Sequence, residues 1–371
     1  MIVPRLKPLT CHAGDGRLLV SLDPRSRVEL ADPSGQVRAL FELLSEGRRT
    51  PSQLAAALAA RWAHITQAEV DEAIEMLDGL GWLDDAAARP LLDDHQRERY
   101  FSNLAFFDAF TSLRRSREAI QQALLRSHVL VLGAGGLGSC VLQNLAGLGV
   151  GRVTLVDQDD VELRNLARQF TYTEAQIGLP KVEQVAAWVR DFNSAIDVTA
   201  HHLRVTGPET IAPLLAGVDL VVCAIDEPPE VDRWVNDVCV GTGLPVVVGG
   251  LTFTQGVYCS VDPGRSACWE CLITHRARPR DDDGTGGLTR IVRASHVNRG
   301  IGPVTTMLGS CVAMEALRYL TGITPPAAAG QYRIVDFAGD GSISSDPWPP
   351  DPACPVCARA RDAITTRQAA A

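Results

Sequence analysis

Four continuous apolar runs recur through the last two-thirds of the chain, and stretches with apolar residues at helical spacing separate them. Strands of a parallel sheet are covered on both faces and are apolar throughout, so these runs predict buried parallel strands. The runs are His128–Leu132, Val153–Val156, Val218–Ala224 and Leu244–Gly249. The helical stretches are Leu137–Leu148, Lys181–Phe192, Val231–Thr242 and Val304–Leu320. This alternation predicts an α/β domain with a doubly wound, Rossmann-like parallel sheet.

The first 85 residues follow a different pattern. Arg17–Asp23 and Arg27–Leu30 predict short strands, and three amphipathic stretches after them predict helices. Two of these helices begin with a capping box, in which a Thr is followed three residues later by a Gln or a Glu. The boxes are Thr50-Pro51-Ser52-Gln53 and Thr66-Gln67-Ala68-Glu69. Two strands with three helices resemble a winged-helix-like α+β unit.

A charged stretch, Asp84–Arg99, follows and predicts a linker. The aromatic-rich Tyr100–Phe110 and a basic amphipathic helix at Ser112–Arg126 come next. A chain of 371 residues has room for about two domains. We therefore expect a small winged-helix-like domain at residues 1–85, a linker with helices at 86–127, an α/β domain at 128–357 and a flexible tail at 358–371.

Composition and charge exclude several classes of protein. The net charge is −9, which argues against a nucleic-acid partner. No run of 18 apolar residues exists, and the first residues lack an apolar signal core. We therefore expect a cytoplasmic protein without a membrane partner. The chain has ten cysteines, and without an export signal they favour metal ligands or buried thiols over disulfides.

A glycine-rich turn follows the first buried run. Gly133-Ala134-Gly135-Gly136-Leu137-Gly138 fits G-x-G-x-x-G between a predicted strand and a predicted helix, where the pattern predicts nucleotide binding. Gly133 makes the turn, Gly135 lets a phosphate approach the backbone, and Gly138 lets helix and strand pack closely. The motif alone does not separate NAD from ATP, and a tight turn without a ligand is the alternative reading.

Polar residues at the ends of the next strands favour ATP. Asp157 ends the second run, in the position of an acid that binds a ribose hydroxyl. Cations and amides pair well with phosphate oxygens, and a carboxylate can hold Mg²⁺ across the phosphates. The residues concerned are Asn165, Arg168, Gln169 and Lys181 for the phosphates and Asp226 for Mg²⁺. A solvated helix face is the alternative reading of these charges.

These motifs, taken together, carry a family resemblance. G-A-G-G-L-G, then D-x-D-x-V-x-x-x-N-L-x-R-Q, then G-x-P-K resemble the ThiF/MoeB/HesA-type adenylyltransferases of the ubiquitin-activating-enzyme superfamily, over about Arg99 to Cys357. The microcin C-type members are the most similar in kind. The resemblance implies that a carboxylate attacks the α-phosphate of ATP and forms an acyl-adenylate and pyrophosphate. It also implies a homodimer. By position, Gly136 and Asp157 contact adenosine, and Arg168, Lys181 and Asp226 act in catalysis.

Two C-x-x-C pairs predict a metal site. Cys268, Cys271, Cys354 and Cys357 supply four sulfurs, the ligand set of tetrahedral, structural Zn²⁺. The resemblance implies that this zinc ties the C-terminal segment back to the domain. Buried thiols or a redox pair are the alternatives. The other six cysteines fall mostly in apolar runs, which predicts buried core positions: Cys11, Cys140, Cys223, Cys239, Cys259 and Cys311.

Two positions depart from the family pattern. Sulfur-transferring members have a reactive cysteine where this chain has His296, so a thioester or persulfide relay is not expected. His296 is either a chemical group or an ordinary loop histidine. The second Arg of the family's R-Y-x-R motif is replaced by Ser102, and Arg99, Arg114 or Arg115 are the candidates to substitute for it.

The N-terminal unit resembles the PqqD-like leader-recognition domain, which binds an extended peptide by adding it to a sheet. Arg17–Leu30 and the apolar stripe within Val70–Leu80 are expected to line the groove, and a dimerisation or DNA-binding winged helix is the alternative. We expect an adenylyltransferase acting on a ribosomally made precursor peptide. The other hypotheses are an activator of a ubiquitin-like sulfur carrier and a non-catalytic peptide scaffold.

Overall fold

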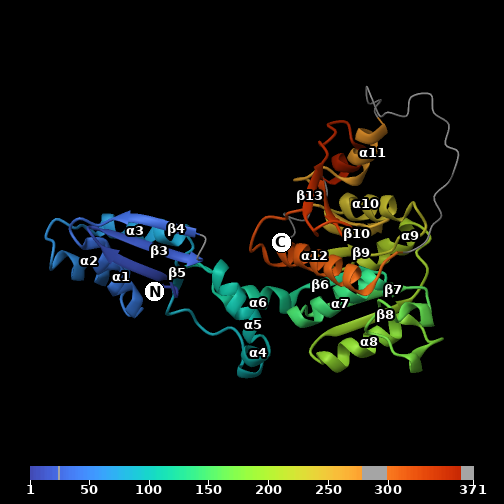
Figure 1. Ribbon diagram of the computed structural model, residues 1–371, viewed down its shortest axis with the longest axis horizontal. Helices are drawn as coiled ribbons and strands as arrows, with labels where there is room; N and C mark the ends of the chain where they lie inside the picture. Colours follow the sequence, from blue (N-terminus) through green and yellow to red (C-terminus); the bar gives the residue numbers. More distant parts are fainter. Residues whose placement is uncertain (24–25, 278–298, 361–371) are drawn as a thin grey trace. The chain divides into compact units, whose positions relative to one another are not determined.

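The computed structural model describes residues 1–23, 26–277 and 299–360 (Figure 1). The chain forms two compact units, Met1–Gln122 and Ala123–Ala371. The division falls within helix α6 (Arg117–Arg126). In the described part of the chain, none of the helices has the length and apolar character that a membrane span requires.

The N-terminal part of the first unit, residues 1–85, combines an antiparallel sheet with three helices in its described residues. Its elements are β2 (Thr10–Gly14), β3 (Arg17–Asp23) and β4 (Ser26–Ala31), paired in that order, and α1 (Gln36–Glu46), α2 (Pro51–Ala59) and α3 (Gln67–Gly79). A short ribbon pairs β1 (Pro4–Leu6) with β5 (Leu83–Asp85). Both predicted capping boxes are present: Gln53 N–H donates to Thr50 Oγ1 at 3.4 Å, and Glu69 N–H donates to Thr66 Oγ1 at 3.3 Å.

Part of the expected peptide groove is core. Val70, Ile74 and Leu77 on α3 are 2%, 5% and 1% exposed and pack with Leu18 and other apolar residues, because the unit needs this stripe to close its core. The prediction that the whole stripe lines an open groove is therefore wrong. Two apolar side chains of this region remain exposed, Met76 and Leu80.

The segment expected to be a linker carries regular structure. It contains β5 and α4 (Asp94–Arg99), and α5 (Phe101–Phe107) with a short 3-10 turn, η1 (Asp108–Phe110), follows. The predicted helix at Ser112–Arg126 begins only at Arg117, because Ser112 and Arg115 pair with each other in a tight turn.

The second unit contains an eight-stranded sheet in the order β13-β12-β11-β10-β9-β6-β7-β8. The strands are β6 (His128–Leu132), β7 (Arg152–Asp157), β8 (Asp197–His202), β9 (Leu220–Cys223), β10 (Val246–Thr252), β11 (Gln255–Val261), β12 (Gln331–Asp336) and β13 (Ile343–Pro347). From β10 to β8 the neighbours are parallel, which confirms the predicted α/β class. From β10 to β13 they are antiparallel, which was not predicted.

Two groups of helices cover this sheet. In one group α7 (Gly136–Leu148) contacts both α8 (Lys181–Phe192) and α12 (Gly302–Thr321). In the other, α10 (Val231–Gly241) contacts α9 (Pro208–Ile211) and α11 (Trp269–Ala277). Figure 1 shows α12 beside α7. Right-handed crossovers put the two groups on opposite faces of the sheet. The described residues of this unit also form three 3-10 turns: η2 (Leu163–Asn165), η3 (Glu174–Gln176) and η4 (Ala212–Leu215).

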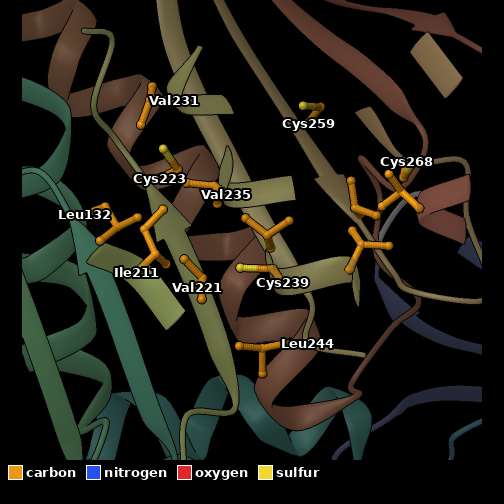
Figure 2. Packing of buried hydrophobic residues seen from close by; sticks show 14 of the residues in the cluster. Leu132, Ile211, Val221, Cys223, Val231, Val235, Cys239, Leu244, Cys259 and Cys268 are labelled. Carbon is orange, nitrogen blue, oxygen red and sulfur yellow. The ribbon is translucent and has the colours of Figure 1, made fainter. Parts of the chain in front are cut away.

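Most of the six remaining cysteines are core residues. Figure 2 shows Cys223 and Cys239 among Leu132, Val221 and Val235. Burial raises the pKa of the Cys223 thiol to about 12, so it stays protonated and unreactive. Cys140 and Cys259 are also buried, as predicted. Cys11 is exposed and Cys311 is half-buried, so the prediction is wrong for Cys11 and only partly met by Cys311.

Candidate functional site

The glycine turn lies where the strand order reverses. β6 pairs with β7 on one side and with β9 on the other, so the loop after β6 opens at the switch point where α/β sheets bind ligands. Gly133 has φ +101° and leaves no space for a side chain, since a Cβ there would lie 2.7 Å from the Ala224 carbonyl oxygen. A Cβ on Gly138 would lie 1.8 Å from the Gly133 carbonyl oxygen. These two glycines are therefore required by packing.

Of the two middle glycines, Gly135 borders more open space than Gly136. The nearest atom to a Cβ on Gly135 would be Gln169 Nε2, at 3.9 Å. Gly135 is the N-cap of α7 and offers no side chain to cap it. A Cβ on Gly136 would lie 3.0 Å from Thr305 Cγ2, so the first turn of α12 borders the start of α7. An uncapped helix start beside open space suits an anionic ligand.

Asp157 holds this loop. Its carboxylate is 8% exposed, and Oδ2 accepts a hydrogen bond from Ala134 N–H at 2.6 Å while Oδ1 accepts one from Asp159 N–H at 2.8 Å. Burial raises the pKa of Asp157, and these two backbone donors oppose that rise. Tyr172, which sequence reasoning missed, donates from its hydroxyl to the Ala134 carbonyl oxygen at 2.7 Å. No motif in the sequence marked this tyrosine.

Asn165, Arg168 and Gln169 lie together on one compact segment. Asn165 is 4% exposed, its Oδ1 accepts from Glu162 N–H at 2.9 Å, and its carbonyl oxygen accepts from the backbone N–H groups of Arg168 and Gln169. Arg168 donates from its guanidinium to the Arg164 carbonyl oxygen at 3.3 Å, and its Cδ lies 3.3 Å from where a Cβ of Gly136 would sit.

Gln169 has an unsatisfied polar atom. The residue is 2% exposed, and within the described structure its Oε1 has no hydrogen-bond partner. Buried side-chain oxygens are almost always paired, so a water molecule or a ligand is expected to donate a hydrogen bond to this one. Its amide faces the open space beside Gly135, which makes it suited to a ligand held at the glycine turn.

Lys181 begins α8 and is tied to the same edge of the sheet. Its side chain is 5% exposed, and Nζ lies 2.8 Å from Asp159 Oδ2. Sequence reasoning missed this partner, although the second Asp of D-x-D was visible. The lysine thus sits near the carboxyl end of β7, where the sheet binds ligands.

Asp226 follows β9 at the same edge and is exposed. The nearby Asp232 has its pKa raised to about 6, first by burial and then by the charge of Asp226. Within the described ranges, Asp226 does not form a group of three metal-ligating side chains. It is therefore placed at the expected edge without protein partners that would complete a metal site.

The four predicted metal cysteines do come together. Their sulfurs all lie within 4.8 Å of one another, with Cys268 to Cys354 and Cys271 to Cys357 at 3.6 Å and Cys268 to Cys271 at 3.9 Å. Sulfurs on a tetrahedral Zn²⁺ with bonds of about 2.3 Å lie about 3.8 Å apart, so the cluster fits zinc. Trp348 Nε1 donates to the Cys268 carbonyl oxygen at 3.1 Å, which fastens the C-terminal segment to the start of α11.

Of the two positions that depart from the family pattern, the structure describes one, Ser102. His296 lies outside the described residues. Ser102 is exposed on α5, Arg99 ends α4, and Arg114 and Arg115 lie in the turn before α6. Burial lowers the pKa of Arg115, and Arg114 is exposed. All four belong to the first compact unit, whereas the glycine turn belongs to the second.

Comparison with known proteins gives relatives for most of the chain. Residues 107–356 match the ThiF family. The chain is 34% identical over 205 residues to the adenylyltransferase and sulfurtransferase MOCS3 of Aedes aegypti, covering 54% of this chain and 44% of that protein. It is 33% identical over 217 residues to the sulfur carrier protein ThiS adenylyltransferase of Escherichia coli, covering 58% and 80%. The chain thus spans about half the length of the MOCS3 relatives.

Solved structures extend the likeness to the whole fold. The crystal structure of E. coli MccB with ATP superimposes with a TM-score of 0.71 at 19% identity, covering 95% of this chain and 99% of that one. At this identity the likeness establishes the shared fold.

Proposed function

Because this chain belongs to the ThiF family, we propose that it is an ATP- and Mg²⁺-dependent adenylyltransferase that activates a carboxyl group of a ribosomally made precursor peptide. The carboxylate oxygen attacks the α-phosphorus of ATP, the bond to the β-phosphate oxygen breaks, and an acyl-adenylate and pyrophosphate form. The observation that carries the proposal is the uncapped start of α7 at the glycine turn, with the nearly buried ammonium of Lys181 at the same edge of the sheet.

The polar residues around the turn have distinct roles in this proposal. Gly135 and the start of α7 face the phosphates, and Gly136 contacts the adenosine. Asp157 contacts the ribose while it holds Ala134. Asn165 and Gln169 donate hydrogen bonds to the nucleotide. Arg168 and Lys181 offset the charge that develops on the phosphates in the transition state, an effect that is strong when the cations are already in place. Lys181 is nearly buried, which suits that role.

Asp226 is the residue that would hold Mg²⁺. Carboxylate oxygens are the ligands Mg²⁺ takes, and the ion typically uses one or two protein carboxylates together with substrate phosphates. Asp226 is an exposed carboxylate that belongs to no group of three metal-ligating side chains among the described residues, which fits Mg²⁺ bound jointly with a nucleotide. The ion would neutralise phosphate charge, and Asp226 would hold it at the carboxyl end of β9.

The cysteine cluster is proposed to hold structural Zn²⁺. Four thiolates close the coordination sphere and leave no open position for a substrate. The zinc would link α11 to the segment that carries Cys354 and Cys357. We also propose that the chain works as a homodimer, with residues 86–127 at the subunit contact, as the family resemblance implies.

The first unit is proposed to bind the leader of the precursor peptide, as a PqqD-like, winged-helix-type domain. β2 and β4 are the outer strands of its described sheet, and an outer strand can accept an extended peptide as one more strand. Met76 and Leu80 offer exposed apolar contacts on and just after α3. Crystal structures of MccB include complexes with its peptide MccA, which supports a peptide partner for this fold.

A second function has support from other relatives. Several of them activate or adenylate sulfur carriers, so a ubiquitin-like carrier ending in Gly-Gly is the alternative substrate. Transfer of sulfur to such a carrier would need a thiol in the segment where this chain has His296. Residues 295–303 contain no cysteine. A non-catalytic peptide scaffold is the third possibility, and the complete set of phosphate-facing residues argues against it.

Product analysis separates the three functions. The full chain is incubated with ATP·Mg²⁺ and either a short peptide encoded beside its gene or a carrier ending in Gly-Gly, and released pyrophosphate is measured. Release with the peptide, lost when its leader is removed, supports the proposal. Release only with the Gly-Gly carrier contradicts it, and release with neither favours the scaffold.

A further inference from the structure

Ala134 is held through both of its backbone polar groups. Its N–H donates to Asp157 Oδ2 at 2.6 Å, and its carbonyl oxygen accepts the Tyr172 hydroxyl hydrogen at 2.7 Å. Ala134 is 0% exposed and Tyr172 is 5% exposed, so water does not compete for either bond. The two side chains therefore fix the orientation of the peptide groups on each side of Ala134.

The second of these peptide groups contains the N–H of Gly135. In a trans peptide the carbonyl and the N–H point in opposite directions, so a bond that fixes the Ala134 carbonyl also aims the Gly135 N–H. Among the hydrogen bonds of the described residues, this N–H has no acceptor. It points away from Tyr172 at the N-cap of α7, where a Cβ on Gly135 would find only Gln169 within 4 Å.

We propose that Tyr172 is a positioning residue of the nucleotide site, which aims the Gly135 N–H at a phosphate group through its bond to the Ala134 carbonyl. The inference rests on the proposed function, since the anion is a phosphate of the nucleotide. Burial, together with the nearby charge of Asp157, raises the pKa of Tyr172, so its hydroxyl keeps the donated proton at every physiological pH.

Removing the hydroxyl tests this role at nearly constant volume. In Tyr172→Phe the ring still fills its place, but the buried Ala134 carbonyl loses its donor. The free energy of the protein falls if this unpaired buried carbonyl turns toward another donor or toward water. The Gly135 N–H then loses its fixed direction. We expect ATP·Mg²⁺ affinity to fall by about three- to tenfold, the range that corresponds to one net hydrogen bond.

A second hydrogen-bonded tyrosine, which is half-buried, provides a control. Tyr319 on α12 donates to Ser260 Oγ at 3.0 Å, and burial raises its pKa as well. Its bond joins α12 to β11, and β11 lies three strands from β6 in the sheet. Tyr319→Phe therefore loses a hydrogen bond from a tyrosine hydroxyl, here a partly buried one, without touching the glycine turn. A general loss of stability would appear in both variants.

Two measurements on the full chain distinguish the positioning role of Tyr172 from a general loss of stability. Amide hydrogen exchange over residues 132–140 is followed without nucleotide, and ATP·Mg²⁺ affinity is measured by titration calorimetry. We expect faster exchange and weaker ATP binding in Tyr172→Phe than in both the wild type and Tyr319→Phe. Equal exchange in the two variants overturns the inference whatever ATP does. Wild-type protein that binds no ATP overturns the proposed function, and with it the role of Tyr172.

A third variant covers the case in which Tyr172→Phe fails to fold. Replacing Tyr172 by p-aminophenylalanine keeps an N–H donor at the para position of the ring, so exchange between the wild-type and Tyr319→Phe range is expected. Exchange in the p-aminophenylalanine variant faster than in Tyr319→Phe, with the ring still buried, contradicts a role for the donated hydrogen bond.

Discussion

The ammonium group of Lys181 lies 2.8 Å from Asp159 Oδ2, and the backbone N–H of Lys181 donates to the Asp159 carbonyl oxygen at 2.9 Å. Lys181 is nearly buried, whereas the Asp159 side chain is 56% exposed. The lysine is thus held at the sheet edge by a carboxylate that a nucleotide phosphate can replace or join. This relationship gives the site a preset cation before any ligand arrives.

Replacing Asp159 by Asn is expected to weaken ATP binding by about tenfold, because the ammonium then lacks the charge that keeps it in place. It is also expected to lower the free energy of unfolding by about 2 kcal/mol, since a nearly buried cation loses its partner. Asp160→Asn is the matched control, because Asp160 is 53% exposed and lies in the same segment. Calorimetry and urea denaturation measure the two effects, and equal effects of the two substitutions would contradict the role of Asp159.

The cysteine cluster predicts one zinc ion per chain. Cys354→Ser is expected to lose the metal and to lower the unfolding midpoint by about 10 °C, because metal binding contributes directly to folding free energy. Cys311→Ser removes a half-buried thiol outside the cluster and should keep its zinc. Elemental analysis of purified protein gives the zinc content. Full zinc occupancy in Cys354→Ser would show that the four sulfurs are not the ligands.

The buried ring of His128 leads us to expect that the protein loses stability in mild acid. Burial lowers its pKa, and its ring contacts the Gly217 carbonyl oxygen at 3.1 Å and Thr154 Oγ1 at 2.8 Å. The folded state therefore favours neutral histidine, and the stability this gives is present above the unfolded pKa of about 6.5 and is lost as the pH falls below it. Denaturation curves at pH 7.5 and 5.5 measure the difference.

The matched substitution for His128 is at His12, an exposed residue on β2. His128→Gln should reduce the dependence of unfolding free energy on pH between these two values, and His12→Gln should leave it unchanged. If His128→Gln keeps the full wild-type dependence, another group carries the effect.

A substitution at Leu80 tests whether peptide binding and ATP binding use different surfaces. It is 43% exposed at the end of α3, so Leu80→Asp removes apolar surface without opening the core. We expect peptide affinity to fall by about tenfold, since a charge replaces a buried contact in the complex, and ATP affinity to stay the same. Ile2→Asp, at a residue 39% exposed in the same unit and outside the proposed subunit contact, serves as the control. Fluorescence anisotropy of a labelled leader peptide measures the change, and unaltered binding in Leu80→Asp would exclude this surface.

Local signals in the sequence predicted part of this fold well. The capping boxes at Thr50 and Thr66 and the apolar run His128–Leu132 depend on short-range hydrogen bonding and burial, and the structure places them as predicted. The strand β2 was missed because its residues are all exposed and show no alternation. The strands β12 and β13 were missed because their pairing is decided by β11, a neighbour distant in the sequence.

The candidate site also has some features that the sequence predicts and others that it does not. The glycine turn and the C-x-x-C pairs have fixed spacing, so the sequence predicts them directly. The bond from Tyr172 to Ala134 joins residues 38 positions apart, and that from Lys181 to Asp159 joins residues 22 apart. No spacing rule covers such bonds, because they depend on how β7 and the following segment fold over β6.

Exchange of labelled pyrophosphate into ATP tests the central claim most directly, because it reports reversible formation of an acyl-adenylate. The full chain, ATP·Mg²⁺ and a peptide encoded beside its gene are compared with the same mixture containing Asp226→Ala. We predict exchange that requires the leader of the peptide and disappears in Asp226→Ala, while that variant still binds the labelled leader. Full exchange in Asp226→Ala, or none in the wild type with any peptide or Gly-Gly carrier, would contradict this account of the site.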